Sequence, residues 1–293
     1  MNDSRFATNV RLVALASLTL LASALLLSAW AKSGPTPAPA HSPTETAPAG
    51  GPWVSLFDGS TMNHWQDPSK FDPPGDAWTI ADGCLKAVPR PRITEDLMSD
   101  DTYTNFEVEF EWRVADGGNS GFKYRIQALP ILTPAIQARS HHFEDQVEAS
   151  LVAKMFSRSL IKPGMRAQIY VVGFEYQTIA GNHPDALRGP LYQSGALYGM
   201  VPPVRNAMRP VAEFNQSRLV VRGNHIEHWL NGEKVVDAEL NSSDALAHTA
   251  HRWGASSQVY KLLSEQPVKA CHISLQNHGD SAWFRNIRIR RLP

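Results

Sequence analysis

The strongest constraint on the fold is a strict alternation of apolar and polar side chains near the middle of the chain. In FEVEFEWRV, residues 106–114, phenylalanine, valine and tryptophan alternate with glutamate and arginine. FKYRIQ, residues 122–127, repeats the pattern after DGGNSG, residues 116–121, which predicts a turn. Because successive side chains of a strand point to opposite faces, the alternation predicts strands with one buried face.

Similar short segments continue to the end of the chain and predict about ten strands in all. The Asn231-Gly232 pair supplies a hairpin turn between two of them. The pattern favours an all-β fold, an antiparallel sandwich or jelly roll in a single domain. The further predicted strands are WTIADGCLKA (78–87), GFEYQTIA (173–180), RLVVRG (218–223), HIEHWL (225–230), KVVDAEL (234–240), CHISLQN (271–277) and WFRNIRIRRL (283–292).

One segment breaks this rhythm. Between Ser140 and Lys162, apolar residues recur at four-residue steps from Phe143 to Met155, and Pro163-Gly164 follows as a stop. This spacing predicts one inserted helical segment, either a lid over a site or a packing element at the rim of the sandwich.

The composition excludes several classes of function. The 28 basic and 28 acidic residues give a formal net charge of zero, which argues against a nucleic-acid partner. The two cysteines form no CxxC pair, so a zinc ribbon or thioredoxin-like site is excluded. Cys84 and Cys271 both lie in predicted strands, and the sequence leaves open whether they form a disulfide or two buried thiols.

The N-terminal region predicts export. Arg5 and Arg11 precede an uncharged stretch that ends at Ala31, so residues 1–31 read as a signal peptide, with an uncleaved membrane anchor as the alternative. Residues 32–51, rich in proline, alanine and threonine, predict an extended linker. The folded domain is then 52–293, in a periplasmic or cell-surface location, and an uncleaved N-terminal segment is the one predicted membrane contact.

Eight ordered blocks resemble a known family. They are VSLFDGSTMNHW, WTIADGCLKA, TNFEVEFEWRVADGGNSGFKYR, GFEYQ, HPDA, SGALYGMVPP, EFNQSRLVVRGNHIEHWLNGEKV and LQNHGDSAWFRNIRIRRL. Together they are similar to the 3-keto-disaccharide hydrolase family, also described as the 3-keto-glucoside-1,2-lyase/3-keto-2-hydroxy-glucal hydratase domain. The resemblance implies a concanavalin-like jelly roll with a sugar-binding concave face, and a glycoside or oligosaccharide substrate oxidised at C3.

The chain departs from the family pattern at three places, one of which is Asn277 in LQNHGD, where aspartate is common. The Glu-x-Gln element of GFEYQ runs into Thr178-Ile179-Ala180-Gly181, where an aspartate is typical of the family. The insertion at about 128–172 is also longer than usual.

The chemistry of a 3-keto-glycoside defines the groups to look for. A ketone at C3 acidifies the proton on C2, so the glycosidic bond can break by elimination, and the resulting glycal can then be hydrated. Such a site needs a base at C2, a stabiliser for the enediolate and an acid for the leaving oxygen.

The predicted catalytic residues are Glu175, His278 and Asp280. Glu175 is the first candidate for the base or a metal ligand, and Gln177 shares its strand face roughly 7 Å away. His278 can donate a proton to the leaving oxygen, with Asp280 fixing its tautomer. The alternative for Glu175 is a solvated glutamate on the outer face, and the alternative for His278 and Asp280 is an ordinary turn.

The predicted substrate-binding residues are Gln177, Lys123, Arg125, Asn119 and Tyr198. Lys123 and Arg125 are predicted to project from the same side of their strand. One of them can stabilise the enediolate, or they can form a salt-bridge ladder with Glu109 or Glu111. Asn119 can also shape the predicted turn, and Tyr198 can stack on a sugar or fill the core.

No cofactor follows with certainty from the sequence. His183 and Asp185, in the loop HPDA, are the candidate ligands for a possible divalent metal.

Two other functions fit the same sequence. A jelly roll lacking one expected acid can be a lectin-like module that binds glycan without turnover. Alternatively, Glu107, Glu109 and Glu111 share one strand face, as alternate carboxylates do in jelly-roll β-glucanases.

Overall fold

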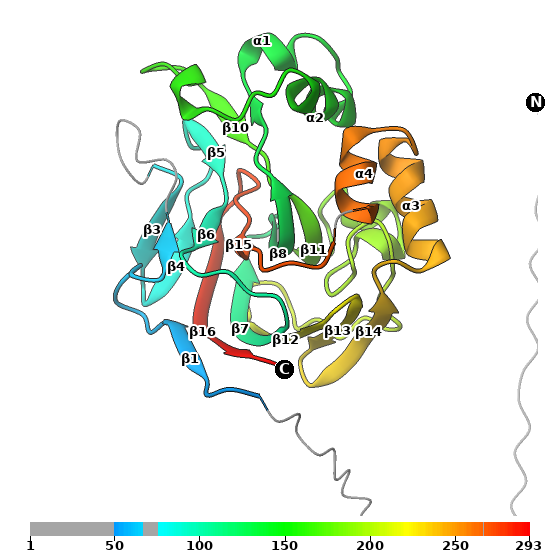
Figure 1. The fold of residues 1–293 in the computed structure, drawn as a ribbon. Coiled ribbons are helices and arrows are strands. Elements are labelled where there is room, and N and C mark those ends of the chain that lie inside the picture. Colours follow the sequence, from blue (N-terminus) through cyan, green and yellow to red (C-terminus); the bar gives the residue numbers. More distant parts are fainter. Residues whose placement is uncertain (1–49, 67–75, 266) are drawn as a thin grey trace, which may run out of the picture. The chain divides into compact units, whose positions relative to one another are not determined.

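Two antiparallel sheets packed face to face form the body of the protein (Figure 1). The structure is a computed structural model that describes residues 50–66, 76–265 and 267–293. These residues belong to one unit, which spans Ala47–Pro293. The all-β sandwich predicted from the alternation is confirmed.

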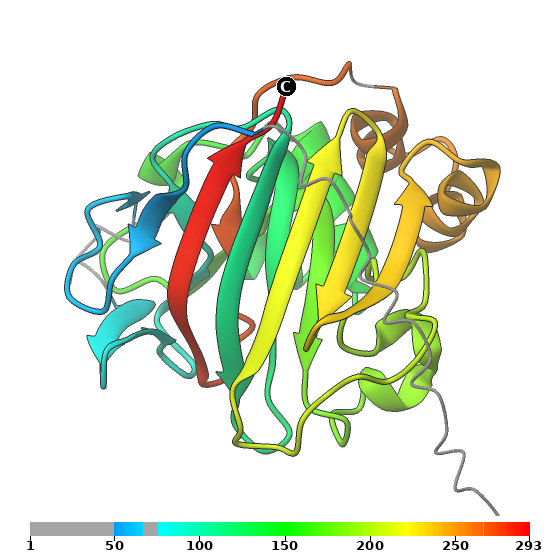
Figure 2. The same ribbon diagram turned by 90° about the horizontal axis from the view of Figure 1, so that it is seen from below.

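The larger sheet forms the outer layer, seen face-on in Figure 2. Its order is β14-β13-β12-β7-β16-β4-β3, and β1 also pairs with β16. The Asn231-Gly232 turn joins β13 to β14, and both residues have positive φ, as predicted. The strands are β1 (Val54–Phe57), β3 (Trp78–Ala81), β4 (Cys84–Ala87), β7 (Phe106–Val114), β12 (Asn215–Arg222), β13 (His225–Leu230), β14 (Glu233–Glu239) and β16 (Ala282–Arg291).

The smaller sheet is the inner layer, and its order is β11-β8-β15-β6-β2. It has one face on the core and the other toward the helices. Its strands are β2 (Trp65–Gln66), β6 (Leu97–Ser99), β8 (Asn119–Ala128), β11 (Val172–Ile179) and β15 (Ser274–Leu275). Because β8 begins at Asn119, the predicted turn over 116–121 is too long, and Asn119 to Gly121 belong to the strand.

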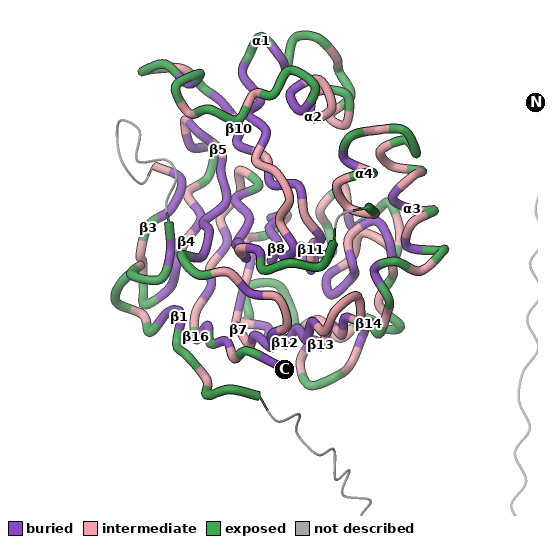
Figure 3. Tube along the Cα trace, viewed as in Figure 1, coloured by how far each residue is buried: buried purple, intermediate pink, exposed green. Residues whose placement is uncertain are grey.

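Many residues of the two sheets are buried, as the purple segments of Figure 3 show, and their apolar side chains form one core cluster. Phe110 of β7 stacks on Phe122 of β8 with ring centroids 4.9 Å apart, and both are almost fully buried. These are the residues that the two-residue alternation assigns to the buried faces. The core therefore fixes which face of β8 and β11 is left for a site.

The predicted insertion carries less helix than expected. It contains β9 (Ile131–Leu132), α1 (Pro134–Gln137), α2 (Phe143–Val152), the 3₁₀ turn η1 (Arg158–Leu160) and β10 (Ala167–Ile169). With β5 (Ile93–Glu95), strands β10 and β9 form a small third sheet, in which β5 and β10 run parallel. The helix ends at Val152 rather than near Lys162, because the chain turns at Lys154, which has positive φ.

A second helical segment is absent from the prediction. Helices α3 (Ser243–Trp253) and α4 (Gln258–Ser264) follow β14, and each begins after a serine whose side chain accepts from a backbone N–H. Glu144 and Arg252 form an ion pair of 3.3 Å between α2 and α3. The two helical segments thus stand together over the inner sheet (Figure 1). The short 3₁₀ turns η2 (Ala186–Arg188) and η3 (Pro190–Tyr192) complete the fold.

Two other expectations have an outcome here. Cys84 and Cys271 are free, buried thiols, so the disulfide alternative is wrong. Among the described residues, no helix has the length and apolar character needed to span a membrane. The predicted signal peptide or anchor, 1–31, and nearly all of the linker lie outside the described residues, so export remains a prediction.

Candidate functional site

A pocket of about 460 Å³ lies on the exposed face of the inner sheet. Strands β8 and β11 and the chain after β15 form its floor, while α2 and α3 contribute Glu144 and Arg252 to its walls. Seven of the residues singled out in the sequence line it: Asn119, Lys123, Glu175, Gln177, Asp185, Tyr198 and His278.

The floor of the pocket is ordered by strand register. In one row Glu175 of β11, Lys123 of β8 and Ser274 of β15 lie side by side. In the next row Gly121 of β8 pairs with Gln177, and its carbonyl accepts from the backbone N–H of Gln276. Side chains two residues apart on a strand share a face, so both rows point into the pocket.

A buried charge cluster occupies the first row. The Lys123 ammonium, with only 1% of the residue exposed, lies 3.6 Å from Asp96 and 3.9 Å from Glu175. Asp96 also accepts a hydrogen bond of 2.9 Å from Ser274. One buried cation is therefore shared by the buried carboxylate of Asp96 and the largely buried carboxylate of Glu175.

Glu175 reaches across the strand beside it. Its carboxylate accepts from the Gln276 amide at 3.4 Å, on the far side of β8. It crosses above Gly121, where an added Cβ would lie 2.6 Å from the Glu175 Oε1 atom. The absence of a side chain at Gly121 is what brings this carboxylate to the centre of the floor.

Burial sets the protonation behaviour of this cluster. It raises the pKa of Glu175, and the charges of Lys123 and Arg252 offset it only in part. Burial also raises the pKa of Asp96, again against the charge of Lys123. Burial opposes the charged form of Lys123, yet the two carboxylates hold its pKa above the usual value. A carboxyl group with raised pKa in a pocket is suited to proton transfer.

Aromatic rings and arginines form one wall. The Tyr198 hydroxyl donates to Asp185 at 3.3 Å, and Arg188 pairs with the same aspartate at 3.1 Å. Arg252 lies over the Tyr198 ring at 4.9 Å. Tyr198 is thus held as part of the pocket lining rather than buried as core filling.

The candidate metal ligands in the structure differ from the predicted pair, His183 and Asp185. His183 lies beside His278 and Asp280, with potential ligand atoms within 4.8 Å of one another, whereas Asp185 turns to Arg188 and Tyr198. The Nδ1 atom of His183 accepts from the backbone N–H of Asp185 at 3.0 Å. Metal-bound histidines usually donate from their other ring nitrogen, so this bond fits a metal ligand poorly. A divalent metal remains a hypothesis.

Asp280 lies just outside the pocket lining. Its carboxylate is 3.7 Å from the Nδ1 atom of His278 and accepts from the Asn119 backbone at 3.2 Å. The neighbouring His278 lowers the pKa of Asp280. This position suits the predicted role of Asp280, which is to fix the tautomer of His278.

Arg125 does not belong to the pocket. Its positive φ of 50° interrupts the alternation of β8, and its guanidinium donates to Asn224 at 2.8 Å and to the Gly223 carbonyl. The prediction that Arg125 projects beside Lys123 is wrong, because the irregular backbone directs it toward the β12–β13 turn.

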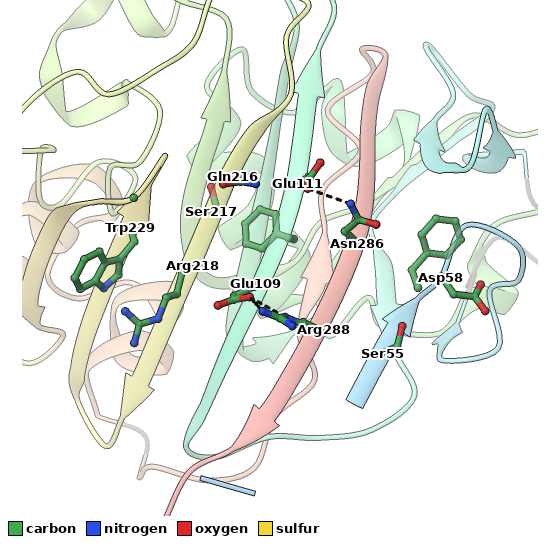
Figure 4. Close-up of a pocket in the computed structure, with 13 residues that line it drawn as sticks. Ser55, Asp58, Glu109, Glu111, Gln216, Ser217, Arg218, Trp229, Asn286 and Arg288 are labelled. Carbon is green, nitrogen blue, oxygen red and sulfur yellow. Dashed lines mark hydrogen bonds and ion pairs between the residues drawn. The ribbon is translucent and has the colours of Figure 1, made fainter. Parts of the chain in front are cut away.

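The carboxylates of β7 lie on the opposite side of the molecule. Figure 4 shows a larger hollow, of about 760 Å³, on the outer face of the large sheet. There Glu109 pairs with Arg288, and Glu111 with Arg285 at 2.8 Å and Asn286. The predicted ladder with Lys123 and Arg125 is therefore wrong, and the cations that pair with these two glutamates come from β16.

This outer hollow is a weaker candidate than the inner pocket. Each glutamate of β7 is neutralised by an arginine, an arrangement that suits a sheet surface. The pairing of all three β7 glutamates with arginines of β16 argues against the β-glucanase alternative.

The pocket residues that the sequence reasoning did not select include Asp96, Gln276 and Arg252. Asp96 precedes a strand of only three residues, and Arg252 is carried by the unpredicted helix α3. The serine cap of that helix is the one local signal that could have indicated it.

The raised pKa of Glu175 predicts a pH-dependent difference in stability. The pKa of Glu175 in the folded protein lies above its unfolded value near 4.5. The contribution of Glu175 to the free energy of unfolding is therefore fully present below pH about 4.5 and is lost as pH rises through the folded pKa. The Glu175→Gln variant should therefore gain free energy of unfolding, relative to wild type, as pH rises from 4.5. Urea unfolding at a series of pH values measures it.

Glu111→Gln is the matched control. Burial acts to raise the pKa of Glu111, but hydrogen bonds from Asn286 and Arg285 outweigh it and lower that pKa. The stabilising contribution of Glu111 is present above its unfolded pKa and lost as pH falls, so the trend of this variant should have the opposite sign. Parallel trends in the two variants would contradict the assignment for Glu175.

Known proteins share this architecture. A protein of Bacteroides thetaiotaomicron named 3-keto-disaccharide hydrolase is 29% identical over 255 residues, which cover 82% of this chain and 78% of that protein. Crystal structures of two candidate glycosyl hydrolases from Parabacteroides distasonis align with 82% of this chain, at TM-scores of 0.56 and 0.53. Their identities are 23% and 24%, over 94% and 100% of their own chains, so they show the shared fold alone.

The family comparison covers most of the chain. Residues 52–290 match the family described as 3-keto-alpha-glucoside-1,2-lyase-like domain. This range contains both helical segments, every residue that lines the inner pocket and both sheets except Arg291, the last residue of β16. The chain therefore belongs to the family of 3-keto-alpha-glucoside-1,2-lyase-like domains.

Proposed function

We propose that the protein is a carbohydrate-active enzyme that cleaves a 3-keto-glycoside by elimination at C2 and subsequent hydration. The observation that carries the proposal is the largely buried Glu175 carboxylate on the pocket floor, 3.9 Å from Lys123. Family membership and the name of the relative from Bacteroides thetaiotaomicron support the substrate class.

In the first half of the reaction, Glu175 removes the proton on C2. The electron pair of the C2–H bond forms an enediolate, whose negative charge resides on the C3 oxygen. Lys123 is the buried cation beside Glu175, and its charge favours both the ionised base and the anion that replaces it. Burial also excludes water, which strengthens these interactions.

In the second half, the enediolate collapses. The C3 ketone re-forms, a C1=C2 double bond appears and the C1–O bond breaks, while His278 gives a proton to the leaving oxygen. Water then adds across C1=C2, with its hydroxyl at C1 and its proton at C2. No oxidant or reductant is consumed.

Isotope incorporation tests this mechanism. The purified protein is incubated in heavy water with p-nitrophenyl 3-keto-glucoside of each anomer, and NMR follows the glycal, the free aglycone and deuterium at C2. Elimination followed by hydration places deuterium at C2 of the product. Direct hydrolysis leaves the original hydrogen there.

Two controls complete the experiment. Incubation without protein measures spontaneous exchange beside the ketone, and the unoxidised p-nitrophenyl glucoside should remain intact. Aglycone release without deuterium at C2 would refute the elimination. Saturable binding with no release would favour a lectin-like module, for which the unpaired amides of the pocket provide a basis.

A further inference from the structure

Three amide side chains of the pocket each have a buried polar atom without a hydrogen-bond partner. They are the Nε2 atom of Gln177, the Oε1 atom of Gln276 and the Oδ1 atom of Asn119. These residues are only 1%, 8% and 2% exposed. A buried polar group without a partner is costly, and such groups in a pocket indicate where a ligand would bind.

Two of these amides are held in a defined orientation. The Oε1 atom of Gln177 accepts from the Thr178 backbone at 2.9 Å, which leaves its Nε2 atom as a free donor. The Nε2 atom of Gln276 donates to Glu175 at 3.4 Å, which leaves its Oε1 atom as a free acceptor. The Asn119 Oδ1 atom is a second acceptor. The unpaired set is therefore one donor and two acceptors.

The three amides surround the proposed base. Gln177 and Gln276 flank Gly121 on its two sides, and the Glu175 carboxylate lies above that glycine. Asn119 lies two residues before Gly121 on the same strand. A ring bound over Glu175 would thus lie among these three amide side chains.

We propose that this set recognises the ketone together with the two hydroxyls beside it; the inference rests on the proposed function. A ketone oxygen can only accept, and Gln177 offers the donor. The flanking hydroxyls at C2 and C4 can donate, and Asn119 and Gln276 offer the acceptors. The substrate class is then a neutral 3-keto sugar with both neighbouring hydroxyls free, so a sugar substituted at its C4 oxygen is rejected.

Binding measurements in an inactive background test the set. In protein carrying Glu175→Gln, isothermal titration with methyl 3-keto-glucoside gives the affinity without turnover. Adding Gln177→Glu preserves the acceptor that faces Thr178 but replaces the donor, and should weaken binding at least about tenfold. Gln127→Glu is the matched control: this β8 amide also has an unpaired buried oxygen but lies outside the pocket, and its change should leave affinity unaltered.

Ligand variants address the hydroxyls. The 4-O-methyl ether of the same ketone should bind at least about tenfold more weakly to the Glu175→Gln protein, and Gln276→Met should remove most of that difference. Equal affinity for the two ligands, or an unchanged affinity in Gln177→Glu, would overturn the recognition set. The proposed function fails separately, if wild-type protein binds the ketone but never releases an aglycone.

Discussion

Turnover of a 3-keto-glycoside should fall by about 10²–10⁴-fold when Glu175 is replaced by glutamine, the range expected for loss of a general base. Glutamine keeps the size of the side chain and can still accept from Gln276, whose amide lies 3.4 Å from the carboxylate. The Asp96–Lys123 pair remains intact, so the change leaves no buried charge unpaired. We therefore expect a folded protein that binds the substrate but does not turn it over.

The kinetic signature separates a catalytic from a structural role. Loss of the base should lower kcat and leave the affinity for the substrate within a few-fold of wild type. In wild type, burial raises the pKa of Glu175, so the acidic limb of the rate profile should lie above pH 4.5. Stopped assays from pH 4 to 9, with Glu111→Gln on the outer face as control, measure both. A variant that retains more than a tenth of wild-type kcat would exclude Glu175 as the base.

The sandwich was predictable because its core is encoded locally. Alternation in residues 106–114 assigns Phe110 to the core and Glu109 to the outer face, and the structure has both there. Because side chains alternate with a period of two, burial of one face fixes the face on which every other residue of the strand lies. Resemblance and alternation together also placed Glu175 and Gln177 on one pocket-facing side.

The remainder of the site depends on contacts between distant segments. Asp96 and Lys123 are 27 positions apart and meet only because β6 and β8 both pair with β15. Arg252 enters through α3, which packs beside the first insertion. No local pattern encodes such a contact. The prediction for Arg125 was wrong for the opposite reason. The strand was assigned correctly, but the positive φ of Arg125 is a local irregularity that turns its side chain away from the pocket.

Replacing Gly121 with alanine should lower turnover by about 100-fold while leaving the fold intact. The new Cβ would lie 2.6 Å from Oε1 of Glu175 and 2.9 Å from its Cδ atom. The flexible side chain would move rather than the backbone, and a displacement of about 1 Å in a reacting group can cost roughly 10²-fold in rate. The φ of Gly121 is not positive, so alanine fits the strand and can stabilise it by about 0.4–1 kcal/mol through the unfolded state.

The opposite signs of the two effects make the result specific. A merely structural glycine would lose stability and activity together, whereas Gly121→Ala should keep its Tm and lose kcat. Gly181→Ala, in open space after β11, is the matched control and should change neither. In protein that already carries Glu175→Gln, Gly121→Ala should have almost no further effect on rate, because both changes act through one carboxylate. Full additivity of the two losses would show that Gly121 serves the reaction by a route that does not involve Glu175.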